Sequence, residues 1–426
     1  PCWKWFVGGK INASYNCVDR HLDKYKNKAA FYFVPEPEDE PPVTITYQEL
    51  YIQVNEFAAL LRDFAGLKKG DRVTLHMPMT SELPVTMLAC ARLGVIHSEV
   101  FGGFSGQASA DRIADAQCKV LIIVDSYYRG GKLIDHKVNA DIAVKAAKKM
   151  GQKVDKVLIW QRYPGQYNSE SKLVKGRDYI VNDVLKKYRG ARVEPVKMAA
   201  EDPLFLMYTS GTTGKAKGCQ HSTGGFLAYV AGTSKFIQDI HPEDVYWCLA
   251  DIGWITGHSY IVYGPLALAA SGVLFEGVPT YPDAGRPWRI AERFDVNIFH
   301  TAPTTVRMLR KAGPDEPKKY NFHFKHMTTV GEPIEPEVWR WYHKEVGKGK
   351  ATIVDTYWQT ETGGFLCSTM PALHPMKPGS AGPAVPGIHP VIYDEDGDEL
   401  GAGAGKAGNI CIQNPWPGAF QTIWGD

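Results

Sequence analysis

The alternation of strand-like and helix-like segments constrains this chain more than any other feature of its sequence. From about residue 30 to residue 160, short apolar runs alternate with segments that have helical spacing. The strand-like runs are 31–34, 72–77, 95–100, 120–124 and 157–160, and the helical segments are 46–64, 82–93, 109–116 and 139–150. The segment 46–64 opens with the capping-box signature Thr46-x-x-Glu49. Strands that alternate with helices form βαβ units with a mostly parallel sheet, so the predicted fold class is α/β.

The alternation of strand-like and helix-like segments resumes after the polar stretch 161–177. Further strand candidates are 204–208, 273–275, 298–300 and 351–355. Beyond Pro378 glycine and proline become dense, and Asp394–Gly397 predicts a hairpin turn after the strand-like run 391–393. We therefore divide the chain into an αβ subdomain with an N-terminal extension at 1–200, a second αβ subdomain at 201–377, and a small, truncated β subdomain at 378–426.

Length, charge and cysteine spacing narrow the class of protein. The 426 residues suffice for two or three domains at ~100–200 residues each. With 48 basic and 46 acidic residues the net charge is +2, which gives no reason to expect a nucleic-acid or membrane-surface partner. No apolar run reaches the ~20 residues that span a bilayer, and no signal peptide is visible. The eight cysteines are scattered without C-x-x-C spacing, which is typical of core residues in a reducing, cytoplasmic setting.

A loop rich in Gly, Ser and Thr follows directly on the strand-like run 204–208. Thr209–Lys215 contains four hydroxyl side chains, two glycines and a lysine. Glycines let the backbone approach an anion closely, and consecutive N–H groups form a concave anion site. A Walker A loop does not fit, because Thr209 occupies its first glycine position and Ala216 follows the lysine. The loop predicts phosphate binding. A merely polar surface loop is the alternative, and entry from a buried strand argues against it.

Four segments in order resemble the acyl-adenylate-forming superfamily. The stretch 208–218 is similar to its AMP-binding signature. The stretches 250–260, 330–334 and 355–364 narrow the resemblance to the acetyl-CoA synthetase family of AMP-forming acetate:CoA ligases. The resemblance implies the large N-terminal domain of that family, with two αβ subdomains, mostly parallel sheets and a partial small β-barrel.

The resemblance also implies a two-step reaction. A carboxylate and ATP give acyl-AMP and pyrophosphate, and the thiol of coenzyme A then displaces AMP to give the thioester. A carboxylate is a poor electrophile because it is charged and lacks a good leaving group. Adenylation removes both obstacles, provided that the enzyme brings two anions together and excludes water.

The family roles for ATP carry over to matching positions. The β- and γ-phosphates would be held by Thr209, Ser210, Gly211, Thr212, Thr213, Gly214 and Lys215. Adenine and the α-phosphate would be framed by Gly331, Glu332, Pro333, Asp355, Thr356, Tyr357, Trp358 and Gln359. Thr360 would donate to the α-phosphate, and Glu361 would hold Mg²⁺, which takes oxygen ligands. An ordinary loop carboxylate is the alternative for Glu361. Lys215, Thr360 and Glu361 are the candidate catalytic residues.

The acyl pocket and the coenzyme A site follow in the same way. The pocket would be lined by Ile255, Thr256, Val330 and Trp358, and the indole would leave room for one or two carbons beyond the carboxylate. A tryptophan that only fills the core is the alternative for Trp358. Acetate or propionate is therefore the expected acid; a ligase for a larger acid and a non-catalytic nucleotide-binding relative are the alternatives. Coenzyme A would be contacted by Arg129, Gly130, Gly131, Lys132, Thr256 and Thr280.

One part of the family pattern has no counterpart before residue 426. In the family, a further section completes the large domain, and a small C-terminal domain supplies the lysine that assists adenylation. We therefore expect this chain by itself to adenylate poorly.

Overall fold

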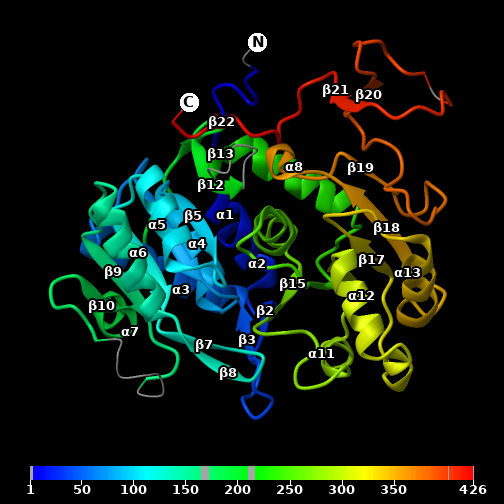
Figure 1. Cartoon of the computed structure of the whole chain (residues 1–426). Helices are drawn as coiled ribbons and strands as arrows, with labels where there is room; N and C mark the ends of the chain where they lie inside the picture. Colours follow the sequence, from blue (N-terminus) through cyan, green and yellow to red (C-terminus); the bar gives the residue numbers. More distant parts are fainter. Residues whose placement is uncertain (1–2, 165–171, 210–215, 402, 426) are drawn as a thin grey trace.

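Two eight-stranded sheets, both mostly parallel, form the core of the molecule (Figure 1). The computed structural model describes residues 3–164, 172–209, 216–401 and 403–425. The predicted α/β class is thereby confirmed. Among the described residues, no helix is long and apolar enough to cross a membrane.

The first sheet has six parallel strands followed by two antiparallel strands at one edge. In spatial order they are β10 (Asp178–Ile180), β9 (Lys156–Trp160), β6 (Val120–Val124), β4 (Arg72–Met77), β5 (Ile96–Phe101), β12 (Pro203–Thr209), β13 (Lys217–Ser222) and β22 (Thr422–Ile423). The helices that follow or precede these strands are α3 (Tyr47–Ala59), α4 (Glu82–Leu93), α5 (Gly106–Asp115), α6 (Lys137–Lys149) and α7 (Val181–Val184).

The second sheet is parallel except for one antiparallel strand at each edge. Its order is β19 (Cys367–Ser368), β18 (Thr352–Tyr357), β17 (His326–Thr329), β16 (Ile298–Thr301), β14 (Val245–Cys248), β15 (Ser271–Phe275), β2 (Ala29–Val34) and β3 (Val43–Thr46). Its helices are α8 (Thr223–Phe236), α9 (Ile255–Gly257), α10 (Gly264–Ala267), α11 (Arg286–Arg293), α12 (Pro303–Ala312) and α13 (Pro336–Trp341).

The remaining elements are short. Three two-stranded pairs are β1 (Lys10–Ile11) with β11 (Met198–Ala199), β7 (Ser126–Arg129) with β8 (Lys132–Asp135), and β20 (Pro390–Tyr393) with β21 (Asn409–Ile412). Near the N-terminus lie α1 (Ala13–Cys17) and α2 (Leu22–Tyr25). Single 3₁₀ or π turns cover Asp19–His21, Leu60–Phe64, Leu185–Tyr188, His258–Tyr263, Glu316–Lys319, Tyr342–Val346 and Thr360–Thr362.

The predicted start of helix α3 is confirmed in atomic detail. Thr46 Oγ1 accepts a hydrogen bond from the backbone N–H of Glu49 at 3.2 Å, and the Thr46 N–H donates to Glu49 Oε2 at 2.7 Å. Both members of the capping box are therefore present, and two N–H groups that the helix cannot pair are satisfied.

The pairing of strands crosses the boundary that we place at residue 200. β2 and β3 come from the start of the chain and join the second sheet, where β2 pairs with β15. β12 and β13 follow residue 200 and complete the first sheet. Local periodicity identifies a strand but not its partner, so the division at 200 and 377 stays a prediction.

The predicted turn at Asp394–Gly397 forms, but it does not join two long strands. Gly397 N donates to Asp394 O at 3.2 Å, and among the described residues an isolated bridge follows, between Tyr393 and Glu399. The main partner of β20 is β21, which comes later in the chain.

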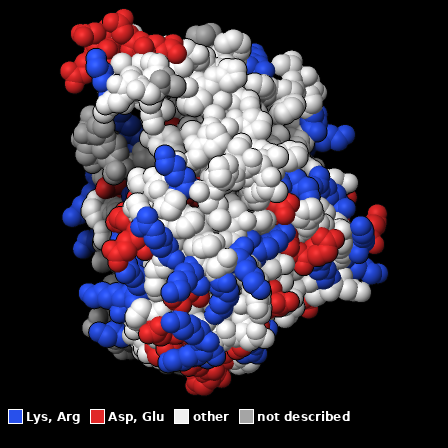
Figure 2. Space-filling view, turned by 90° about the vertical axis from the view of Figure 1, so that its right-hand side faces the viewer, with Lys and Arg blue, Asp and Glu red and all other residues white. Residues whose placement is uncertain are grey.

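Charged side chains of both signs are interspersed over much of the surface. On the face shown in Figure 2, Lys and Arg lie among Asp and Glu over the lower half, and one acidic group stands at the upper edge. This mixture matches the small net charge of +2.

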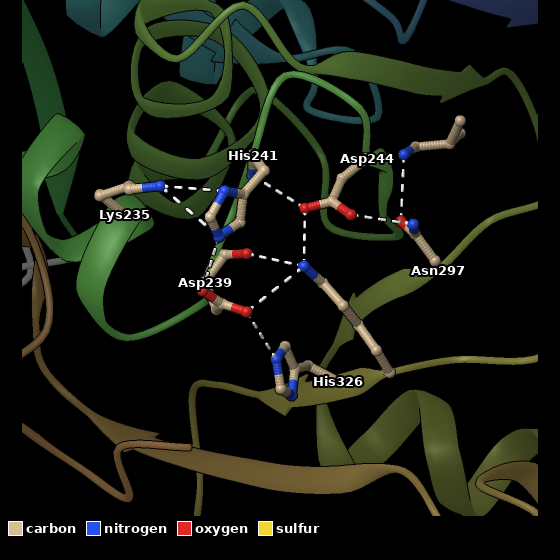
Figure 3. Close-up of polar contacts among 8 residues, drawn as sticks. Lys235, Asp239, His241, Asp244, Asn297 and His326 are labelled. Atoms are coloured by element: carbon tan, nitrogen blue, oxygen red, sulfur yellow. Dashed lines mark hydrogen bonds and ion pairs between the residues drawn. The ribbon is translucent and has the colours of Figure 1, made fainter. Parts of the chain in front are cut away.

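A polar cluster ties the amino-terminal edge of the second sheet together (Figure 3). Lys325, just before β17, donates to the backbone O of Asp239 and to Asp244 Oδ2, both at 2.8 Å. Asn297 donates to the other Asp244 oxygen at 2.9 Å, and His241 Nε2 lies 2.9 Å from Asp239 Oδ1. The cluster fixes the loop between α8 and β14.

Candidate active site at the carboxyl ends of the strands

A cleft of about 460 Å³ opens where the carboxyl ends of strands from both sheets meet. The first sheet contributes Met79 after β4 and the Phe101–Gly103 segment at the end of β5. The second contributes residues after β14, β15 and β17, among them Asp251, 276–279 and 330–331. In open α/β sheets this edge is where ligands bind, so the cleft is the candidate active site.

The Arg129–Lys132 segment forms the tight turn between β7 and β8. Gly130 and Gly131 have φ of 60° and 76°, a conformation that favours glycine. The Arg129 side chain lines the cleft and places its guanidinium 5.8 Å from the centre of the Phe101 ring. Lys132 is exposed and is not among the residues that line the cleft. The structure therefore brings one of the two predicted basic residues to the cleft wall.

The ends of β17 and β18 are locked together by a buried carboxylate. Asp355 is only 4% exposed and accepts from Thr329 Oγ1 at 2.6 Å and from Thr356 N at 3.0 Å. Thr356 Oγ1 donates to Thr329 O at 2.6 Å. Burial raises the pKa of Asp355, and the two hydrogen bonds oppose that rise. The segments 330–333 and 357–359 consequently leave the sheet side by side.

Glu361 stands beside the strand that follows the predicted phosphate loop. Burial raises the pKa of the Cys219 thiol on β13 to about 12, and the nearby Glu361 carboxylate adds to the rise. Within the described residues, the Glu361 carboxylate makes no hydrogen bond or ion pair. Its backbone O accepts from Phe420 N at 2.8 Å. Thr209 ends β12 opposite Lys217, and Ser210–Lys215 lie outside the described residues.

A single carboxylate at this place is compatible with Mg²⁺. The ion is commonly held by one or two carboxylates together with substrate phosphates, rather than by a full protein cage. In the part of the chain that the structure describes, no group of three or more His, Cys, Asp or Glu could hold a metal. The one carboxylate of Glu361 fits a metal that arrives with nucleotide phosphates.

The predicted acyl pocket divides into two layers. Thr256 and Val330 line the cleft, whereas Ile255 and Trp358 belong to the buried core cluster that also includes Val330. The Trp358 ring meets the rings of Tyr260 and Phe365 edge to face, at 5.2 and 5.6 Å between centroids. The indole is thus held in place by two neighbouring rings and is not among the residues that line the cleft.

Other predicted residues lie at the margin of the cleft. Gly331 lines it with φ +99°, and Glu332 is turned to an ion pair with Arg307 at 2.7 Å. Thr280 directly follows the lining segment 276–279 and is not itself among the lining residues.

Sequence reasoning missed three acidic residues around the cleft. Asp251 lines the cleft, and burial raises its pKa to about 6. Glu276 is buried in an ion pair with Arg162, and burial raises its pKa to about 7. Glu36, fully buried, lies behind the turn that carries Arg129. A position directly after a parallel strand was the available signal for Glu276.

Comparison with known proteins defines the class of this fold and site. Residues 18–424 match the AMP-binding enzyme family, so the chain belongs to that family. Among its relatives are the acetyl-coenzyme A synthetases of Wolinella succinogenes and Rhizobium rhizogenes, which are 50% and 48% identical over 100% and 99% of this chain. The chain spans 64% of the length of each of these relatives.

A solved structure shows the same fold. The acetoacetyl-CoA synthetase from Streptomyces lividans superposes with a TM-score of 0.86 at 26% sequence identity. The alignment covers 100% of this chain and 63% of that one. The resemblance of the sequence motifs to acyl-adenylate-forming enzymes is thereby confirmed at the level of the family.

Proposed function

We propose that the full-length protein activates acetate or propionate with ATP and transfers the acyl group to coenzyme A. The observation that carries the choice of acid is the fixed position of Trp358. The residue is 8% exposed, and its ring meets those of Tyr260 and Phe365 edge to face; these two rings stack with 4.1 Å between their centroids. A braced indole cannot turn aside for a longer acyl chain. The identity to acetyl-coenzyme A synthetases supports the same acid.

In the first step, the loop Thr209–Lys215 would hold the β- and γ-phosphates while Thr360 donates to the α-phosphate. Glu361 would hold Mg²⁺, which when bound neutralises charge on the departing pyrophosphate. The adjacent ends of β17 and β18, joined through Asp355, would frame the nucleotide. Their rigidity favours in-line approach of the carboxylate oxygen to the α-phosphorus.

In the second step, coenzyme A would enter the cleft past Arg129 and Thr256. The thiol sulfur attacks the acyl carbon, the bond to AMP breaks, and the thiol proton leaves to solvent or a nearby base. The cleft lies where the carboxyl ends of both sheets meet. The thiol of coenzyme A could therefore approach the acyl carbon from a different side than the AMP that leaves it.

Substitution of Trp358 tests the proposal. In Trp358→Gly, measured in the full-length protein, AMP release with acids of four to six carbons should rise while release with acetate falls. One methylene of fit is worth ~1–3 kcal/mol, so the preference should move by ~10–200-fold per carbon. Trp3→Gly, which removes an indole that is 59% exposed outside the cleft, is the control. An unchanged acid preference in Trp358→Gly would refute the assignment of the acyl pocket. Absence of acetate-dependent ATP–pyrophosphate exchange in the wild type would instead favour a non-catalytic relative.

A further inference from the structure

The carboxylate of Glu36 is fully buried and accepts three backbone hydrogen bonds. Gly130 N and Val278 N donate to Oε2 at 2.8 and 2.9 Å, and Gly131 N donates to Oε1 at 2.8 Å. Burial of a carboxylate is costly unless its oxygens are hydrogen-bonded, and bonds to a charged acceptor are stronger than neutral ones. Glu36 therefore binds two separate segments of the chain tightly to one point.

Both of these segments border the candidate active site. Gly130 and Gly131 form the turn that presents Arg129 to the cleft, and Val278 belongs to the cleft wall after β15. Glu36 itself is not among the residues that line the cleft. It joins the hairpin β7–β8 to the segment that follows β15, at the carboxyl end of the second sheet.

The backbone around Glu36 is itself fixed. Arg286 Nη2 donates to Pro35 O at 2.8 Å, which anchors the residue before Glu36 to α11. On the other side, Gly277 has φ +114°, and a Cβ at this position would lie 2.4 Å from Glu36 Oε2. A side chain at position 277 would thus collide with the carboxylate in the place where it accepts the three hydrogen bonds.

We propose that Glu36 is a positioning residue for the acyl acceptor: it holds the Arg129–Lys132 turn against the cleft wall so that Arg129 meets the phosphate groups of coenzyme A. This inference rests on the proposed function, because it requires coenzyme A as the acceptor. The charge of Glu36 and its hydrogen bonds have opposite effects on the binding of coenzyme A. The negative charge of Glu36 repels an anionic ligand, whereas its three hydrogen bonds create the geometry that binds one.

The isosteric variant Glu36→Gln separates the two effects. An amide keeps one acceptor oxygen and places an NH₂ group against at least one backbone N–H. In the full-length protein, loss of positioning should raise KM for coenzyme A by roughly tenfold, the change expected from losing a charge-assisted hydrogen bond. Acetate-dependent ATP–pyrophosphate exchange, which needs no coenzyme A, should stay within about twofold. Removal of charge alone would lower that KM instead.

Two controls accompany this variant. Glu49→Gln changes an exposed carboxylate that caps α3 and does not line the cleft, so KM for coenzyme A should remain unchanged. Pantetheine carries the reacting thiol but no phosphate. With pantetheine as acceptor, kcat/KM of Glu36→Gln and of the wild type should therefore be about equal.

A second variant weakens the same contact while keeping the charge. Glu36→Asp shortens the side chain by one methylene, so its oxygens no longer reach all three N–H groups, and it should likewise raise KM for coenzyme A while pyrophosphate exchange persists. An unchanged or lower KM in both variants, an equal loss with pantetheine, or failure of both variants to fold would overturn the positioning role. If the wild type itself forms no acyl-coenzyme A, the proposed function fails first, and this inference with it.

Discussion

Thr329 Oγ1 donates a 2.6 Å hydrogen bond to the buried carboxylate of Asp355 on the neighbouring strand. The bond joins the carboxyl ends of β17 and β18, from which the predicted nucleotide segments 331–333 and 355–359 depart. A short bond to a buried carboxylate is both a structural tie and a source of charge stabilisation.

Thr329→Val should therefore weaken both stability and nucleotide binding. Asp355 would keep only the N–H of Thr356, so the free energy of unfolding should fall by ~1–3 kcal/mol and KM for ATP should rise. Urea denaturation and steady-state kinetics measure the two effects. The control is Thr328→Val on the same strand, because the buried Thr328 hydroxyl has no hydrogen-bond partner among the described residues. An equal loss in both variants would contradict the role of Thr329.

Glu361→Gln should reduce the rate of ATP–pyrophosphate exchange and raise the Mg²⁺ concentration needed for half-maximal rate. The amide keeps the shape of the side chain but loses the charge that a hard cation prefers. Exchange rates measured over a range of Mg²⁺ concentrations test this expectation. Glu337→Gln removes an exposed carboxylate paired with Arg310 and should leave the Mg²⁺ dependence unchanged. The same half-saturation in Glu361→Gln and the wild type would remove Glu361 as a ligand.

Lys325→Met should destabilise the fold without changing KM for any substrate. Its ammonium group bonds Asp244, whose side chain is only 6% exposed, and the backbone O of Asp239 (Figure 3). Loss of these bonds leaves a buried carboxylate with fewer donors, at a cost of ~1–3 kcal/mol. Lys318→Met breaks an exposed pair with Asp315 and should cost ~0–1 kcal/mol. Thermal or urea unfolding distinguishes the two variants; equal stability would show that the cluster contributes little.

Buried histidines predict a loss of stability in mild acid. Burial lowers the pKa of His136 and His258 from 6.5 to about 4 and that of His300 to about 3. The unfolded chain therefore takes up protons at these sites below pH 6.5, while the native protein does not until about pH 4. These histidines leave the free energy of unfolding unchanged above pH 6.5. Below pH 6.5, each of them lowers it by ~1.4 kcal/mol for every unit that the pH drops.

Urea titrations between pH 8 and pH 5 measure this dependence. His136→Gln should reduce the slope by ~1.4 kcal/mol per pH unit, because the amide can donate to His76 O as the imidazole does at 2.8 Å but cannot take up a proton. A free energy of unfolding that is constant from pH 7 to pH 5 would contradict the prediction.

Local sequence patterns predicted most of the strands, because periodicity acts over a few residues; β13, β14 and β17 were not predicted. They could not show that β2 joins the second sheet, since its partner β15 lies far along the chain. Glu36 shows the same limit at the site. The N–H groups that surround it belong to residues 94, 95 and 242 positions away, so no local pattern marks it.

The exchange of strands between the two sheets has a consequence for biosynthesis. The apolar strand β2 emerges from the ribosome long before β15, its only parallel neighbour, and residues 35–270 must be translated in between. At ~5–20 residues per second this interval lasts on the order of ten seconds or more. During that time the nascent chain presents an unpaired, aromatic-rich strand edge. Chaperone contact and translation speed should therefore change the yield of folded protein, whereas the free energy of unfolding of the finished protein should stay the same.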